Sequence, residues 1–203
     1  MTGSQPTSLI LEGIVTSVSA AGEVNIAPMG PRVDPSMERF LLRPYPTSTT
    51  YRNLKVHGEG VLHVTDDVLL LARAAVGPVE PPPALVPARH VRGFVLAGAC
   101  RYYEFRIAAI DEREERVRIE AEVVHTARLR DFFGFNRAKH AVVEAAILAT
   151  RTDFLPRDDI EAEYRKLAVI VEKTGGAQEK EAFAFLQEHV ARAFRLAGGG
   201  RRS

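Results

Sequence analysis

Residues 103–123, YEFRIAAIDEREERVRIEAEV, carry the clearest structural pattern in the chain. From Val117 onward, apolar residues alternate with arginine and glutamate, which is typical of a β-strand with one face buried and the other in water. Earlier in the stretch Tyr103, Phe105 and Ile107 point one way, so Glu104 and Arg106 are expected on the opposite face. The acidic run from Asp111 to Glu115 separates the two halves and predicts the turn of a β-hairpin.

Shorter extended segments precede this hairpin. β-Branched and aliphatic residues predict strands at residues 9–18, 23–28, 37–42 and 60–65. Asp66 and Asp67 are suited to cap a short helix that extends through Arg73. The proline-rich stretch from Gly77 to Pro87 is expected to be a loop.

The hydrophobic period changes after Asn136. Apolar residues then recur three or four positions apart, which is typical of amphipathic helices. We expect helices over residues 136–150, 156–174 and 178–197. The alanines of the first of these form a small-residue face, which permits close approach to another element of the same subunit or of a partner subunit.

Composition limits the classes of function. The chain has 203 residues and a formal net charge of +1, so no strong overall field attracts nucleic acid or an anionic membrane. Cys100 is the single cysteine, which fits a reducing compartment, and no apolar run is long enough to span a bilayer. Residues 1–8 lack the pattern of a signal peptide. We therefore expect a soluble, cytoplasmic protein.

Common enzyme motifs are missing from the sequence. It has no G-x-G-x-x-G after a strand, no Walker A sequence, no H-E-x-x-H and no G-x-S-x-G. His140 and Glu144 lie four residues apart, but no third ligand follows in helical register, so we expect no metal site. We interpret His63 and Cys100 as packed residues with a structural role. No residue identifies itself as a catalytic acid or base.

Five blocks of sequence resemble a known family. They are NIAPMG (25–30), RPYPTSTTYRNL (43–54), VLHVTDD (61–67), CRYYEF (100–105) and GFNRAKHAVVEAAILATR (134–151). From about Leu11 to Phe194 the chain is similar to the uncharacterised family called domain of unknown function 447. That family is placed among the FMN-binding split barrels, beside flavin reductases and pyridoxamine-phosphate oxidases. The resemblance implies a homodimer with FMN near the subunit interface, and it supplies no substrate.

Pattern and resemblance together predict an α+β fold, namely an FMN-binding split β-barrel with a C-terminal helical region. The barrel core is expected at residues 9–130 and the helices packed on it at residues 131–197. We expect disorder at residues 1–8 and 198–203. Whether the C-terminal helices cover the flavin or brace the dimer is left open by the sequence.

A hydroxyl-rich loop is the candidate site for the FMN phosphate. Its candidate ligands are Arg43, Ser48, Thr49 and Thr50, with Asn53 as a further helper. A phosphate dianion needs several short donors at once, and hydroxyls, backbone N–H groups and a guanidinium supply them. Taken alone, such a stretch is more commonly a surface loop, and Asn53 equally suits a capping role. The resemblance favours the phosphate site.

The segment that ends the second predicted strand is the candidate site for the flavin ring. Its members are Asn25, Ala27, Pro28, Met29 and Gly30. A flavin needs a flat slot and backbone donors or acceptors at its pyrimidine edge, and this segment leaves its backbone uncrowded. The same residues equally fit an edge strand that stops at a proline.

These inferences predict an FMN-binding flavoprotein that acts as an oxidoreductase on an unknown small molecule. The alternatives are a flavin carrier or sensor without turnover, and a split-barrel enzyme that uses a deazaflavin. The electron donor and acceptor stay open. A second copy of the chain is the partner that we expect, with no nucleic acid and no membrane.

Overall fold

The computed structural model describes residues 9–199, which form two compact units. The sheet unit contains the described residues up to Thr65 together with Pro82–Phe132. The helical unit contains Asp66–Pro81 and the described residues from Phe133 onward. Each unit therefore draws on two separate stretches of the chain.

This division differs from the expected one in its boundaries. The segment Asp66–Pro81 groups with the C-terminal helices, whereas the sequence pattern placed it in a core at residues 9–130. The last helix also extends to Gly199, two residues beyond its expected end. The disorder expected at residues 1–8 and 200–203 lies outside the described residues.

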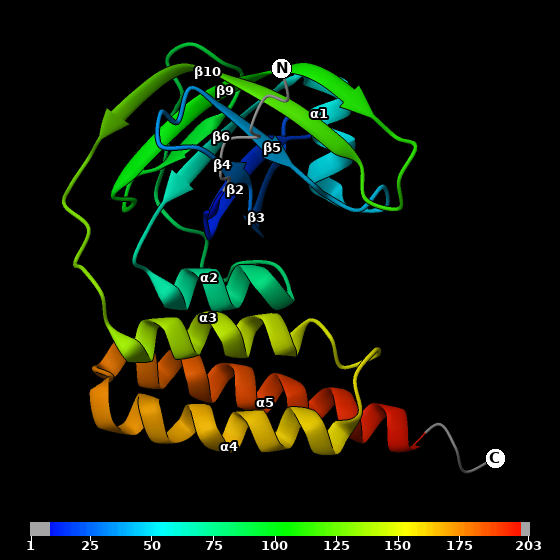
Figure 1. Ribbon diagram of the computed structural model, residues 1–203, viewed down its shortest axis with the longest axis vertical. Coiled ribbons are helices and arrows are strands. Elements are labelled where there is room, and N and C mark those ends of the chain that lie inside the picture. Colours follow the sequence, from blue (N-terminus) through cyan, green and yellow to red (C-terminus); the bar gives the residue numbers. More distant parts are fainter. Residues whose placement is uncertain (1–8, 200–203) are drawn as a thin grey trace, which may run out of the picture. The chain divides into compact units, whose positions relative to one another are not determined.

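Eight strands of the described chain form one antiparallel sheet that curls as a half-barrel (Figure 1). Their bounds are β1 (Leu9–Ile10), β2 (Gly13–Val18), β3 (Val24–Met29), β4 (Arg32–Val33), β5 (Arg39–Leu42), β6 (Glu59–Val64), β9 (Arg101–Asp111) and β10 (Arg118–Arg128). Their order across the sheet is β1-β4-β5-β10-β9-β6-β2-β3. The α+β split-barrel class expected from the sequence is confirmed.

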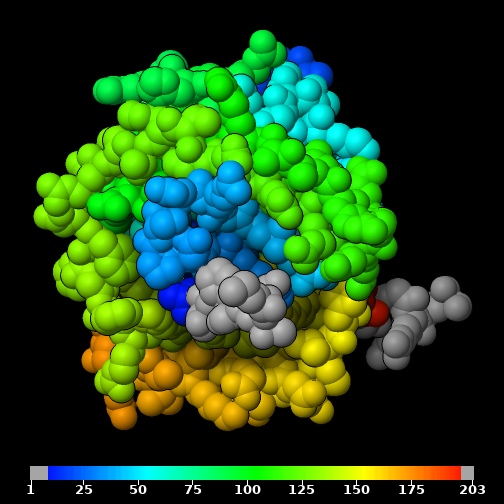
Figure 2. Space-filling view, turned by 45° about the horizontal axis from the view of Figure 1, so that its top comes forward, coloured from blue at the N-terminus to red at the C-terminus, as the bar shows by residue number. Residues whose placement is uncertain are grey.

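The predicted hairpin is the pair β9–β10 at the middle of this sheet. Ile119 and Ala121 of β10 are buried, while Glu120 and Glu122 between and after them are exposed, as the alternation predicted. Strand β10 pairs with β9 along one edge and with β5 along the other. Figure 2 shows the segment around β5 in blue, adjoining green residues of the hairpin.

Glu104 of β9 lies on the face opposite Tyr103, as the alternation predicted, and it is withdrawn from water there. Its side chain is fully buried, and its two carboxylate oxygens accept hydrogen bonds from the backbone N–H groups of Arg89 (2.9 Å) and His90 (2.6 Å). Arg106 on the same face is exposed, and it pairs with Glu59. Buried charges require such partners, and here a distant loop supplies them.

Each face of the sheet carries its own apolar cluster. The inner face holds the main core, in which Val15, Leu62 and Phe105 are fully buried. On the outer face, Val61 and Tyr102 pack against residues of the segment that carries β7 (Leu85–Pro87) and β8 (Phe94–Leu96). A side chain of the sheet that contacts a ligand therefore does so on either the inner or the outer face.

Helix α1 (Thr49–His57) begins inside the stretch that we expected to be a loop. Ser48 is its N-cap, and the Ser48 hydroxyl oxygen accepts a hydrogen bond from the N–H of Tyr51 at 3.2 Å. Both prolines precede this cap, so they do not interrupt the helical hydrogen bonds. The helix packs against β2 and β3.

Four helices make up the helical unit within the described residues: α2 (Val68–Val76), α3 (Arg137–Ala149), α4 (Arg157–Thr174) and α5 (Ala177–Gly199). The three predicted C-terminal helices and the short helix capped by Asp67 are confirmed. The alanine face of α3 is buried, and α3 packs against α2, α4 and α5. These alanines are thus accounted for within one subunit and give no support to a subunit interface. None of the described helices has both the length and the apolar character needed to cross a membrane.

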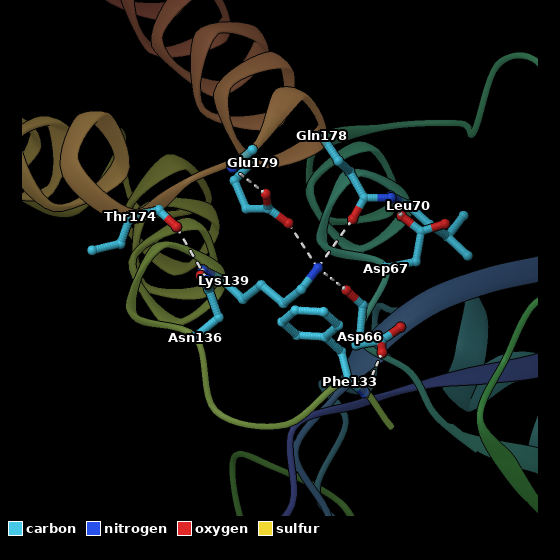
Figure 3. A network of polar contacts seen from close by, with 10 residues as sticks. Asp66, Asp67, Leu70, Phe133, Asn136, Lys139, Thr174, Gln178 and Glu179 are labelled. Atoms are coloured by element: carbon cyan, nitrogen blue, oxygen red, sulfur yellow. Dashed lines mark hydrogen bonds and ion pairs between the residues drawn. The ribbon is translucent and has the colours of Figure 1, made fainter. Parts of the chain in front are cut away.

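A buried ion pair joins three segments of the helical unit (Figure 3). The Lys139 ammonium donates hydrogen bonds to Glu179 Oε1 (2.7 Å), to the backbone oxygen of Asp66 (2.8 Å) and to Gln178 Oε1 (3.3 Å). Burial disfavours the charged form of Glu179, but hydrogen bonds from Lys139 and from the Gly176 N–H outweigh it and keep the pKa of Glu179 below its usual value. Every donor of the ammonium has an acceptor, so this cluster holds the unit together and leaves no capacity for a ligand.

Candidate functional site

The structure brings two of the predicted site segments into contact. The Asn25 side-chain amide of β3 donates a hydrogen bond to Thr50 Oγ1 of α1 at 3.0 Å. Beside it, the Asn53 amide donates to Ser17 Oγ of β2 at 3.2 Å. Ser17 lies opposite Asn25 in the β2–β3 register, so all four side chains meet on one face. We call Ser17, Asn25, Thr50 and Asn53 the polar cluster.

The polar cluster is largely withdrawn from water. Ser17, Thr50 and Asn53 are buried, and Asn25 is half-buried. Because polar groups in such a place need partners, the cluster fixes the first turn of α1 against β2 and β3. Ser17 was not predicted as a site residue. Its partner Asn53 is 36 residues away on a helix, and nothing in the aliphatic strand around Ser17 indicates that contact.

The hydroxyls of the predicted phosphate site have different roles. The Ser48 hydroxyl donates to the backbone oxygen of Tyr45 at 2.8 Å and also caps α1, so it is fully used in shaping the turn. Thr49 is exposed, and its Oγ1 accepts a hydrogen bond from Arg52 Nη2 at 3.1 Å. Thr49 and Thr50 form the first turn of α1, where backbone N–H groups have no partner within the helix. These N–H groups are available donors for an anion.

The Arg43 side chain contacts the turn between β9 and β10. Its Nη2 pairs with Glu114 Oε2 at 2.9 Å, and within residues 9–199 no hydrogen bond joins it to Ser48, Thr49 or Thr50. Its Nε is buried and has no partner among the described residues, so the guanidinium has a buried donor that is not used. Arg43 as a phosphate ligand stays a prediction.

Arg52 is the cation that the structure places beside the hydroxyls. Its Nη1 donates to the backbone oxygen of Thr47 at 2.7 Å while its Nη2 reaches Thr49. Arg52 was not predicted as a site residue, because the stretch before it was expected to be a loop. Once the helix is known to begin at Thr49, the spacing of three residues puts both side chains on one face.

The predicted ring segment lies on β3, at one edge of the sheet. Asn25, Ala27 and Met29 share a face with the polar cluster, and Met29 packs against the main core. Pro28 tolerates this position because an edge strand need not donate its N–H to a neighbour. A Cβ at Gly30 would lie 2.9 Å from Ile10 Cγ2 and 3.3 Å from Glu12 Oε1, so these side chains occupy the space beside Gly30.

His63 is a buried, neutral residue. The Leu96 N–H donates to its Nε2 at 3.0 Å, so its Nδ1 carries the proton and donates to the backbone oxygen of Ile14 at 3.1 Å. Burial lowers the pKa of His63 to about 4, against the opposing effect of the bond to Ile14. The interpretation of His63 as a packed residue is confirmed, and Cys100 is likewise buried.

A half-barrel of antiparallel strands with a polar cluster between its edge strand and α1 defines a protein of the split-barrel class. Solved structures with this fold include an FMN-bound protein from Methanosarcina mazei, which is 22% identical, with 89% of this chain and 94% of that chain covered and a TM-score of 0.76. Flavoredoxin of Desulfovibrio vulgaris (Miyazaki F) is 13% identical, with 63% and 75% covered and a TM-score of 0.51. The 2-nitrobenzoate 2-nitroreductase of Pseudomonas fluorescens is 15% identical, with 62% and 66% covered and a TM-score of 0.50.

The chain belongs to the family described as protein of unknown function DUF447. The model of that family's N-terminal domain matches residues 11–130, and the model of its C-terminal part matches residues 136–188. The protein from Methanosarcina mazei is assigned to the same family. Among curated proteins, none matches this sequence.

Proposed function

We propose that the protein binds FMN and acts as an FMN-dependent oxidoreductase. The observation that carries the proposal is the contact between Asn25 and Thr50, which joins the predicted ring segment to the predicted phosphate segment. Two segments that are distant in sequence thereby form one surface. The FMN-bound member of the same family supports the choice of ligand.

The residues present fit the phosphate of FMN. The first turn of α1 offers the N–H groups of Thr49 and Thr50, the exposed Thr49 hydroxyl adds another donor, and Arg52 adds a charge-assisted one. Arg43 retains an unpaired Nε and would exchange its bond with Glu114 for one with the phosphate. Ser48 and Asn53 would act by holding the turn in shape.

The residues of β3 fit the flavin ring. The outer edge of this strand is not paired within the described sheet, so its backbone groups are free to meet the pyrimidine edge of the flavin. The small side chain of Ala27 leaves room for a flat ring beside β3, whereas the space next to Gly30 is taken by Ile10 and Glu12. When bound, FMN supplies the electron-transfer chemistry, while these residues position it and exclude water.

The phosphate site is tested by comparing FMN with riboflavin, which lacks the phosphate. A charge-assisted contact is worth about 1.5–3 kcal/mol, so Arg52→Met should weaken FMN binding roughly tenfold to a hundredfold. Arg43→Met should have the smaller effect, about tenfold, because Arg43 must first give up Glu114. Riboflavin affinity should stay within about twofold in both variants. Equal affinity of the native protein for FMN and riboflavin would show that this surface is not a phosphate site.

The oxidoreductase activity is tested by anaerobic mixing of the FMN-loaded protein with NADH or NADPH, followed by oxygen. Loss and return of the flavin absorption band in repeated cycles is the expected result. A mass spectrum of the ligand released by denaturation should show FMN rather than a deazaflavin. A flavin that no physiological donor reduces would contradict the oxidoreductase assignment while leaving the binding site intact.

A further inference from the structure

A cavity lies in the sheet unit, where β6 ends and β9 begins. Its volume is about 320 Å³. Three arginines line it, namely Arg101, Arg128 and Arg130, with a single aspartate, Asp131. Arg130 is engaged by backbone oxygens of Gly98 and Asp131, so Arg101 and Arg128 are the arginines considered for a ligand. The half-exposed ring of Phe132 and the buried ring of Tyr103 form the apolar part of the wall.

Two of these arginines face each other across neighbouring strands. Arg101 of β9 lies directly opposite Arg128 of β10, and like charges in this position repel. The Arg101 guanidinium makes no hydrogen bond or ion pair within residues 9–199. Arg128 pairs with Asp131 at 2.8 Å, but the Asp131 side chain is 84% exposed, so water screens this pair strongly. A bound anion would relieve the repulsion.

The cavity opens on the same face of the sheet as the polar cluster. Arg101 lies opposite Val64 of β6, and Tyr103 lies opposite Leu62. Cross-strand partners share a face, and Val64, Leu62 and Tyr103 all pack in the main core of the inner face. Arg101 and Arg128 therefore stand at the rim of the inner face.

Strand register also places the cavity at the same end of the sheet as the predicted ring segment. Met29 of β3 is opposite Gly13 of β2, and the next residue of β2, Ile14, is opposite His63 of β6. The residue after His63 is Val64, the partner of Arg101. A ligand held by Arg101 is thus on the same face of the sheet as the predicted ring segment and at the same end of the strands.

We propose that this cavity binds the substrate of the flavin, and that the substrate is an organic anion. Arg101 and Arg128 bind its carboxylate or phosphate, for which paired guanidinium groups are well suited, and Phe132 and Tyr103 contact a flat apolar body. This assignment of substrate class rests on the FMN site proposed above. The protein should therefore prefer an anionic substrate over a neutral one of the same shape. Neither the strand pattern nor membership of the family predicts this preference.

The test uses three probes: benzoate, its neutral analogue benzamide, and inorganic phosphate. Calorimetric titration of the FMN-loaded protein should show benzoate binding at least about tenfold tighter than benzamide. Benzoate should also bind more tightly than inorganic phosphate, because only benzoate has an apolar body. Arg101→Met and Arg128→Met should each weaken benzoate binding about tenfold or more. The matched control is Arg118→Met, which removes an arginine of β10 that does not line this cavity. This variant should change the benzoate affinity less than about twofold.

FMN affinity, measured separately by quenching of flavin fluorescence, distinguishes failure of this proposal from failure of the proposed function. Unchanged FMN affinity in Arg101→Met with benzoate binding lost is the expected result. Loss of both ligands in folded Arg101→Met would overturn the proposal, because Arg101 would then serve FMN itself. Equal affinity of the native protein for benzoate and benzamide would also overturn the proposal. So would equal affinity of the native and variant proteins for benzoate. Benzoate binding by a native protein that binds no FMN would leave an anion site but refute the flavoprotein assignment.

Discussion

Acidification should destabilise the sheet unit through His63. The imidazole is fully buried, its Nε2 accepts from the Leu96 N–H, and burial lowers its pKa from the usual 6.5 to about 4. Protonation is therefore easier in the unfolded chain than in the folded one. The stabilisation is fully present above about pH 6.5 and is lost as the pH falls toward 4.

The size of this effect follows from the difference between the two pKa values. With a pKa of 6.5 in the unfolded chain and about 4 in the folded protein, the unfolding free energy falls by about 3 kcal/mol between pH 7 and pH 4. Carboxylates such as Asp111 and Glu179, whose pKa values are also lowered, titrate in the acid range as well. Comparison with His63→Gln removes their contribution, since they are the same in both proteins.

Urea unfolding at a series of pH values, followed by far-ultraviolet circular dichroism, measures the difference. At pH 7 the native protein should be the more stable of the two, because glutamine reproduces the hydrogen bonds to Ile14 and Leu96 imperfectly. This advantage should shrink by about 3 kcal/mol at pH 4. A constant gap across the pH range would refute the buried neutral imidazole. An NMR titration of His63 gives the pKa directly and should find it well below 6.5.

Three further outcomes are expected. Ile119→Ala should lower the free energy of unfolding by about 2–5 kcal/mol, because the Ile119 side chain is fully buried in the main core. Arg118→Ala, on the other face, should change it by no more than about 0.5 kcal/mol. Similar losses in both variants would contradict the face assignment. Lys139→Met should cost about 3–5 kcal/mol by leaving Glu179 buried without its partner, and the added change Glu179→Leu should recover part of that loss in thermal unfolding. Light scattering after size exclusion should give about twice the chain mass of 22.4 kDa for the FMN-loaded protein, and a monomeric mass at micromolar concentration would remove the homodimer proposal.

The elements that sequence alone predicted are those with a strong local period. The alternation around Ile119 and the helical spacing after Asn136 each reflect burial along a single element, so β10 and the C-terminal helices were correctly assigned. The sheet order required pairing between segments far apart in the chain. Pairing of this kind cannot be predicted from one segment. The family resemblance supplied the split-barrel class, and the strand order came only from the structure.

Other features depend on parts of the chain that are distant in sequence and could not be predicted from one segment. The burial of Glu104 is possible because the N–H groups of Arg89 and His90 bond its carboxylate. At the candidate site, Asn25 and Thr50 were chosen for separate roles, and their contact could be seen only in three dimensions. Arg52 was overlooked because the prolines suggested a loop, whereas the Ser48 cap starts a helix directly after them.

The origin of the helical unit from two stretches of chain has a consequence for synthesis on the ribosome. Helix α2 emerges before the second half of the sheet unit and long before α3 and α5, against which it packs. Until those helices are made, its apolar side chains, which include Val68, Leu71 and Ala72, have no partners from their own unit. A chain that stops at Phe132 would end in this state permanently. Such a fragment should aggregate or recruit chaperones even if its sheet folds, so the two family regions are not expected to be independent in the cell.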